Sequence, residues 1–148
     1  MLRTFLSVAA LLLCGCSDKD TLNELGTTIV TLPDGQKIRA EVLTHAKDML
    51  RGMMFRDSLP KDCGMLFIHG SPGRYPYWMY QVNVPLDILW IDPNKNVVEV
   101  SLDTAPCRSK SAQECPNYGG NAVAVYVLEL AAGTARKHGV NVGSRLSF

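Results

Sequence analysis

The chain has 148 residues, 47% of them hydrophobic and 20% charged, which is ordinary for one globular domain with its own core. The formal net charge is +1, and the lysines and arginines form no basic run. This charge argues against nucleic acid as a partner. We therefore expect one folded unit that is a monomer.

The N-terminal segment has the pattern of a bacterial lipoprotein signal. Residues 1–3 are a short positive region, and residues 5–13 are an apolar stretch too short to span a bilayer. The stretch ends in LCGC, which resembles a lipobox, where a small residue precedes the cysteine that receives diacylglycerol. Cys16 follows Gly15 and is the expected lipidation site, whereas Cys14 follows a leucine. An ordinary signal peptide cleaved nearby is the alternative.

This interpretation divides the chain into a signal peptide (1–15), a lipidated tether (16–26) and a single β-rich domain (27–148). Acyl chains on Cys16 would hold the domain at a lipid bilayer, since each buried CH₂ contributes about 0.8 kcal/mol. Ser17 follows the lipidated cysteine. By resemblance to lipoprotein sorting in Gram-negative bacteria, this serine favours the outer membrane, facing the periplasm, over the inner membrane. The expected location is therefore the bacterial cell envelope.

The patterns after the tether predict seven or eight strands and two short helices. Apolar and charged residues alternate at 36–43, after a Pro-Asp-Gly turn, as in an antiparallel hairpin with one buried face. Regular turn signals between short strands favour a compact antiparallel sandwich or a barrel-like single domain. The expected elements are strands at 27–32 and 36–43, a helix at 45–51, a strand at 64–68, two strands within 77–92, strands at 97–102 and 122–130, a helix at 134–138, and a turn and strand at 140–148.

Residues 77–92, YWMYQVNVPLDILWID, are the apolar centre of the domain. They read as two strands joined at 83–85, with one carboxylate, Asp87, in the second. Strand alternation puts Asp87 on one face with apolar residues, so the carboxylate needs a charged partner or hydrogen bonds. We expect an ion pair with Arg51 or Arg56, or backbone N–H donors. The functional alternative is a binding or acid–base group in a cleft.

Aromatic residues gather just before and within this stretch. Tyr77, Trp78 and their neighbours could stack on a sugar or pack on a partner protein, and Met79 lies among them. The alternative is that half of these rings belong to the core. Several methionines suit Cu(I) chemically, but methionine in apolar runs is more often core, so we expect no metal and no cofactor.

Two cysteines bracket the polar segment RSKSAQE. Export permits disulfides, and a bond between Cys107 and Cys115 would close a short loop and stabilise the fold by about 2–3 kcal/mol. Cys63 is then expected to be a half-buried, unreactive cysteine and not a nucleophile, since no histidine follows it at a spacing typical of a nucleophile. Residues 92–96 have D-x-N-x-N spacing but lack the glycine of a calcium loop, so a turn between strands is expected.

Several motifs in order resemble one family. RGMMFRDSLPKDCGMLFIH, YPYWM, PLDILWID, CPNYGGNAVAVYVLEL and AAGTARKHGVNVGSRL are similar to motifs of the domain of unknown function 192 family, from about residue 51 to the C-terminus. The resemblance implies a compact mainly-β fold in an often exported protein, and no established reaction. Many members have Lys-Asn-Thr where this chain has Tyr80-Gln81-Val82, and Gly-Asp where it has Gly143-Ser144. If those residues line a site in the family, this chain binds a different ligand there or none.

No complete catalytic motif is present in the sequence. The three histidines are far apart, and neither a P-loop nor a nucleophile elbow occurs. A lone Asp87 lacks the second carboxylate of a glycosidase, unless Asp103 or Glu129 approaches it. The favoured hypothesis is a membrane-anchored, non-catalytic envelope lipoprotein that binds a glycan or a protein. The alternative is a small hydrolase or metal-handling protein that uses Asp87 with a nearby arginine.

Overall fold

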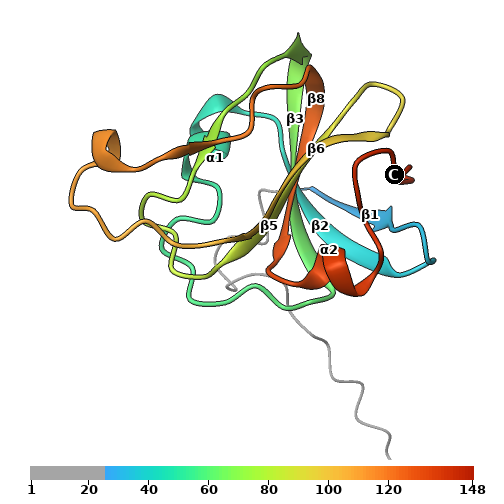
Figure 1. The fold of residues 1–148 in the computed structure, drawn as a ribbon, viewed down its shortest axis with the longest axis horizontal. Helices are drawn as coiled ribbons and strands as arrows, with labels where there is room; N and C mark the ends of the chain where they lie inside the picture. Colours follow the sequence, from blue (N-terminus) through green and yellow to red (C-terminus); the bar gives the residue numbers. More distant parts are fainter. Residues whose placement is uncertain (1–25) are drawn as a thin grey trace, which may run out of the picture.

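The computed structural model describes residues 26–148 (Figure 1). The predicted signal peptide, Cys16 and all of the tether except Gly26 lie outside the described residues. Neither α-helix in the described part is long and apolar enough to cross a membrane. The elements are β1 (Thr27–Thr31), β2 (Lys37–Leu43), α1 (Ala46–Arg51), β3 (Cys63–Gly73), β4 (Tyr77–Trp78), β5 (Leu86–Ile91), β6 (Val97–Thr104), the 3-10 helix η1 (Ala112–Glu114), β7 (Asn117–Tyr118), β8 (Ala124–Ala131) and α2 (Thr134–Lys137).

Six strands form one sheet in the order β1-β2-β3-β8-β5-β6, and β4 and β7 form a separate pair. The β2–β3 pair is parallel, and the other strand pairs are antiparallel. This arrangement confirms the predicted mainly-β single domain with two short helices. The parallel pair is possible because α1 and the segment after it carry the chain back between β2 and β3.

The C-terminal segment links the two ends of the sheet. It bridges β1 through Thr31 and Ser147, where the Thr31 amide donates to the Ser147 carbonyl oxygen at 2.8 Å. It also bridges the β5–β6 turn through Asn96 and Arg145. These bonds satisfy backbone groups that would be unpaired at open sheet edges, and they give the domain its barrel-like closure.

The two faces of the sheet cover two separate parts of the core. Leu89 in β5 and Leu128 in β8 belong to the core cluster on one face. Trp90 and Val127, their immediate neighbours in sequence, belong to the cluster on the other face. Successive side chains of a strand point to opposite faces. Each residue of β5 and β8 can therefore be assigned to one face or the other. We call the side of Trp90 and Val127 the Trp90 face.

The predicted hairpin within residues 77–92 is wrong. β4 pairs with β7, Tyr77 opposite Tyr118, whereas β5 lies between β6 and β8 in the large sheet. All six residues of β5 are buried, so both of its faces require a core and both of its edges require a strand partner. The sequence after β5 supplies these partners, and β4 is left to pair elsewhere.

Close packing fixes the β4–β7 pair to the sheet. The Trp90 indole N–H donates to the Tyr75 carbonyl oxygen at 2.7 Å. Gly119, with φ +65°, lies against the same ring, and a Cβ there would come within 2.1 Å of it. The loop before β7 contains the expected disulfide between Cys107 and Cys115, with Cα atoms 5.8 Å apart. Residues 92–96 form the expected turn, in which Asp92 accepts the Asn96 N–H at 2.8 Å.

Candidate functional site

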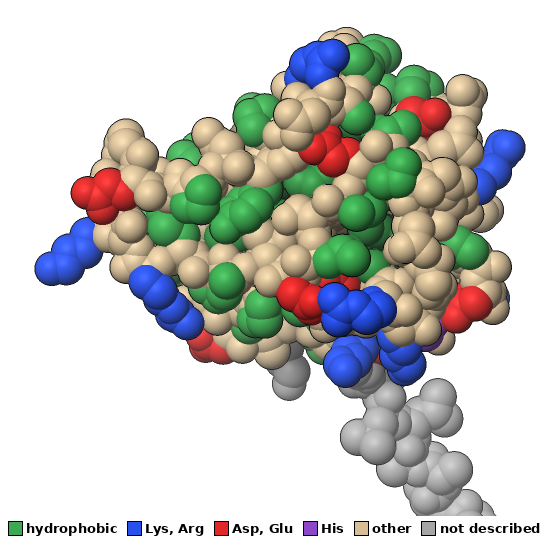
Figure 2. Space-filling model, in the orientation of Figure 1, with side chains coloured by type: hydrophobic (Ala, Val, Ile, Leu, Met, Phe, Trp, Pro, Cys, Tyr) green, Lys and Arg blue, Asp and Glu red, His purple; other side chains and the backbone are tan. Residues whose placement is uncertain are grey.

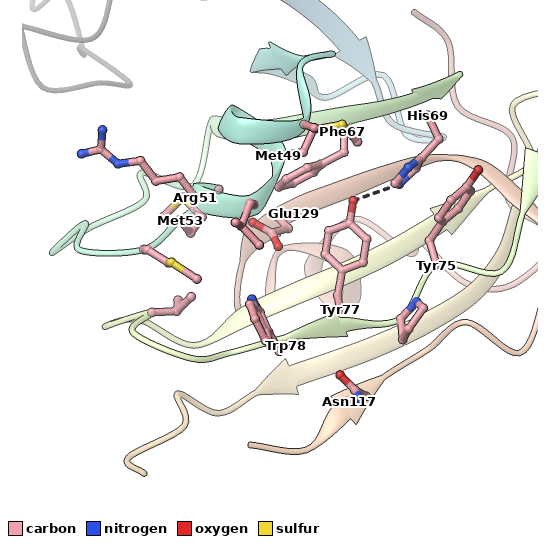
Figure 3. Close-up of a pocket in the computed structure, with 16 residues that line it drawn as sticks. Met49, Arg51, Met53, Phe67, His69, Tyr75, Tyr77, Trp78, Asn117 and Glu129 are labelled. Carbon is pink, nitrogen blue, oxygen red and sulfur yellow. Dashed lines mark hydrogen bonds between the residues drawn. The ribbon is translucent and has the colours of Figure 1, made fainter. Parts of the chain in front are cut away.

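A pocket of about 500 Å³ opens on the Trp90 face, within the size range of small-ligand sites (Figure 3). α1 and the turn after it form one wall, and the other side chains come from β3, β4, β7, β8 and the loops on either side of β4. Most of the lining is apolar or aromatic. The lining residues are Ala46, Met49, Leu50, Gly52, Met53, Met54, Phe67, Tyr75, Pro76, Tyr77, Trp78 and Val82, with four polar ones, Arg51, His69, Asn117 and Glu129.

Local backbone geometry brings the α1 wall close to the sheet. α1 ends at Gly52, whose φ of +43° favours glycine and whose added Cβ would lie 3.1 Å from the Phe67 ring. The chain then crosses to the segment after β4, where the Phe55 amide donates to the Gln81 carbonyl oxygen at 2.9 Å. These contacts tie both walls of the pocket together.

Glu129 of β8 is the polar group at the floor of the pocket (Figure 3). Its side chain is 4% exposed, and Oε2 is buried without a hydrogen-bond partner. Burial raises the pKa of Glu129 to about 8, against the opposing effect of the Arg56 charge. The carboxyl group is therefore mainly protonated at pH 7, and can both donate and accept a hydrogen bond.

Arg56 lies beside Glu129 but is held by another carboxylate. Its guanidinium donates twice to Glu41 of β2, at 2.6 and 2.7 Å, in a bidentate pair. Both side chains are largely buried, at 17% and 3% exposure. This bidentate geometry occupies the two N–H donors of Arg56 that suit a carboxylate best. They are therefore not available to a ligand.

His69 and two tyrosines form the polar side of the pocket. The hydroxyl of Tyr77 lies 3.2 Å from His69 Nε2, and the ring of Tyr75 stacks on His69 with centroids 3.5 Å apart. Burial lowers the pKa of His69 below its usual value. Burial first, and then the Glu129 charge, raise the pKa of Tyr77 well above its usual range. His69 and Tyr77 are therefore uncharged at pH 7. The guanidinium of Arg51 points away from the cavity (Figure 3).

The expected ion pair between Asp87 and Arg51 or Arg56 is wrong. Asp87 is fully buried and accepts two backbone N–H groups, from Asp103 and Ala135, both at 2.9 Å. Sheet alternation explains the difference, because Asp87 shares its face with Leu89 and so lies opposite the pocket. The carboxylate joins β5 to the end of β6 and to α2, which is a structural role.

Only some of the predicted binding residues lie together at the pocket. Arg51, Tyr77 and Trp78 line the pocket, and Arg56 lies close to it. Met79 is fully buried in the core and does not line it.

Sequence reasoning missed Glu129 and His69 as site residues. The signal for Glu129 was present, because this carboxylate interrupts the apolar run VYVLELA as Asp87 interrupts LDILWI. His69 carried no such signal.

The candidate catalytic carboxylates do not meet in one site. Asp103 is engaged by Arg136 at 2.7 Å, and Glu129 is on the other face of the sheet, so neither joins Asp87 as a second catalytic carboxylate. Within residues 26–148, no three His, Cys, Asp or Glu side chains are grouped to hold a metal ion. What remains is one protonated carboxyl group in an apolar pocket.

Comparison with known proteins places this fold in a family. The model of the family DUF192, described as "Uncharacterized ACR, COG1430", matches residues 29–148. The chain belongs to the DUF192 family. No curated protein matches the chain at a significant level.

Two crystal structures resemble this DUF192 chain. A protein of unknown function from Novosphingobium aromaticivorans DSM 12444 is 23% identical, with a TM-score of 0.72, over 84% of this chain and 85% of that one. A putative transcription regulator from Sinorhizobium meliloti 1021 is 27% identical, with a TM-score of 0.70, over 80% of this chain and 89% of that one. The first similarity supports the fold alone. The second structure has the same fold under a different description.

The departure from the common DUF192 motif falls partly on the pocket. Gln81 has φ +56°, in the left-handed region. Asparagine adopts this conformation more readily than glutamine, so the backbone here suits the Asn of Lys-Asn-Thr. Val82, which departs from the Lys-Asn-Thr pattern, lines the pocket. Valine brings no hydroxyl group, so the pocket is apolar at this position.

Proposed function

We propose that this chain is a lipid-anchored, non-catalytic binding protein of the bacterial cell envelope, and that its pocket holds an apolar group of a partner protein. The anchor is Cys16, and Ser17 favours the outer membrane, facing the periplasm. The observation that carries the proposal is the apolar pocket with Glu129 at its floor, whose Oε2 is buried without a hydrogen-bond partner. A buried polar group without a partner is unfavourable, and a ligand with a matching group would relieve this.

The surroundings of the pocket favour a protein partner. Leu50, which lines the pocket, and Phe55, just after α1, are 63% and 60% exposed. Large apolar side chains beside a pocket are typical of protein-binding surfaces. Met49, Met53 and Met54 add flexible side chains that adapt to an inserted group. On the face that Figure 2 shows, hydrophobic side chains lie among polar ones, and lysine and arginine lie mostly near its outline.

A glycan is less well supported than a protein. The rings of Trp78 and Tyr80 are tilted by 60° with centroids 6.0 Å apart, so the two rings form no flat platform. Sugar recognition also requires many hydrogen-bonding groups, and this pocket offers few. The hydrolase alternative is unsupported for a different reason, because both oxygens of Asp87 already accept backbone hydrogen bonds.

A pocket-filling variant tests the binding site. We would place a photo-crosslinking amino acid at Leu50 in cells and compare crosslinked envelope proteins between the parent and a Met49→Trp variant. We expect Met49→Trp to abolish the crosslink and a matched Val142→Trp variant, at an exposed apolar residue that does not line the pocket, to keep it. A crosslink that survives Met49→Trp unchanged would refute the pocket as the binding site.

The anchor has its own test. Metabolic labelling with palmitate should label the parent chain and not a Cys16→Ser variant, which should also leave the membrane fraction. Equal membrane retention of both proteins would contradict lipidation at Cys16.

A further inference from the structure

The chemistry of the pocket floor restricts what can enter, provided that the pocket is the partner site as proposed above. We propose that the pocket selects an uncharged apolar group carrying an amide, whose carbonyl oxygen accepts a hydrogen bond from the carboxyl group of Glu129. In a protein partner this is an internal peptide segment with an apolar side chain. A chain end, with its charge, would not fit.

The geometry gives Glu129 this role. The side chain comes from the centre of β8, between Met65 of β3 and Ile88 of β5, so the backbone cannot move it out of the core. Oε2 is buried without a partner, although the residue lines the cavity. The O–H of a protonated carboxyl group can donate to an amide carbonyl oxygen, which is a strong acceptor.

The groups around Glu129 argue against a charged ligand. They are Tyr77 of β4, His69 of β3, Arg56 with its partner Glu41 of β2, and Arg51 of α1. The Arg56–Glu41 pair is already compensated, and the guanidinium of Arg51 points away from the cavity (Figure 3). Tyr77 and His69 carry no charge at pH 7. An anion would therefore enter without a free cation at the floor. Binding of a cation would require Glu129 to lose its proton and the cation to lose its water. The attraction within a buried ion pair seldom exceeds these two costs.

Protonation of Glu129 gives the inference a pH signature. With a pKa of about 8, the donor is present at pH 7 and mostly lost at pH 9. Affinity for an uncharged amide should therefore fall about tenfold between these pH values. Tyr77 stays protonated over this interval, since its pKa is raised well above its usual range, and His69 stays neutral.

Three small probes with the same apolar body test the selection. N-acetylphenylalaninamide is uncharged, N-acetylphenylalanine carries a carboxylate, and N,N,N-trimethylphenylalaninamide carries a permanent positive charge. Binding to the full chain in detergent would be measured at pH 7 by amide chemical shifts of pocket residues. We expect the uncharged probe to bind at least about tenfold more tightly than either charged one, and Met49→Trp to block it.

Two variants of Glu129 separate hydrogen bonding from folding. Glu129→Gln keeps a neutral donor of the same shape, so it should retain the affinity for the uncharged probe within about threefold and remove its pH dependence. Glu129→Met keeps the length and loses the donor, so it should weaken binding about tenfold. Retained pH dependence in Glu129→Gln would overturn the inference.

The outcomes distinguish the inference from the function beneath it. Tightest binding of a charged probe that Met49→Trp blocks overturns the selection rule and leaves the pocket as the binding site. Binding that Met49→Trp does not affect overturns the proposed function. No shift at pocket residues up to the solubility limit of all three probes also overturns the selection rule.

Discussion

Replacing Glu129 with glutamine should remove a pH-dependent loss of stability. The folded protein holds the carboxyl group with a pKa of about 8, whereas the unfolded chain has an ordinary value near 4.5. The stability that this group contributes is thus fully present below pH 4.5, and is lost as the pH rises toward 8. Glutamine resembles the protonated acid at every pH, so the variant should not lose it.

The size of the effect follows from these two pKa values. Two and a half pH units separate 4.5 from 7, and each unit corresponds to about 1.4 kcal/mol. The difference meant here is the free energy of unfolding of the wild type minus that of Glu129→Gln. This difference should therefore be about 3 kcal/mol lower at pH 7 than at pH 4.5. Above pH 8 the difference should stop growing, because both states of the wild type are then ionised.

The assay is chemical denaturation of both proteins at intervals from pH 4.5 to 9, with the free energy of unfolding extrapolated to water. Other titrating groups, such as Asp34 and Glu99, are present in both proteins and cancel in the difference. An exposed glutamate gives the matched control, and Glu114→Gln should change stability little at any pH. A difference between wild type and Glu129→Gln that stays constant over this range would refute the neutral, buried carboxyl group.

Three further changes test the framework of the fold. Asp87→Asn should lower the free energy of unfolding by about 2–4 kcal/mol, because one of the two backbone N–H groups would face an amide NH₂ group. It should leave probe binding unchanged. Loss of binding with normal stability would contradict the structural role. Cys107→Ser should lower stability by about 2–3 kcal/mol, judged against wild type with and without reductant, and a wild type insensitive to reductant would count against the disulfide. Gly119→Ala should lower the melting temperature sharply, whereas Gly35→Ala, where the added Cβ has open space, should lower it less; equal effects would contradict the packing of Trp90 on Gly119.

Alternation and turn signals predicted much of the fold because they act over short distances. The strand at 36–43, the turn at 92–96 and the disulfide all depend on residues close in sequence. The pairing of β4 with β7 depends on residues some forty positions apart, and no local pattern specifies it. The fully buried β5 is the clearest case, since an apolar run reveals burial on both faces but not which strands cover its edges.

For the site, the sequence alone determined that two carboxylates, Asp87 and Glu129, lie within apolar runs and must be satisfied or neutral. Only the tertiary structure decided which of them faces a cavity. The register of β5 against β8 puts the two on opposite faces of one sheet. Asp87 then meets backbone N–H groups from two distant segments, while Glu129 meets the space below α1. A one-residue change of register would reverse these faces, and that register is set by the packing of the whole sheet.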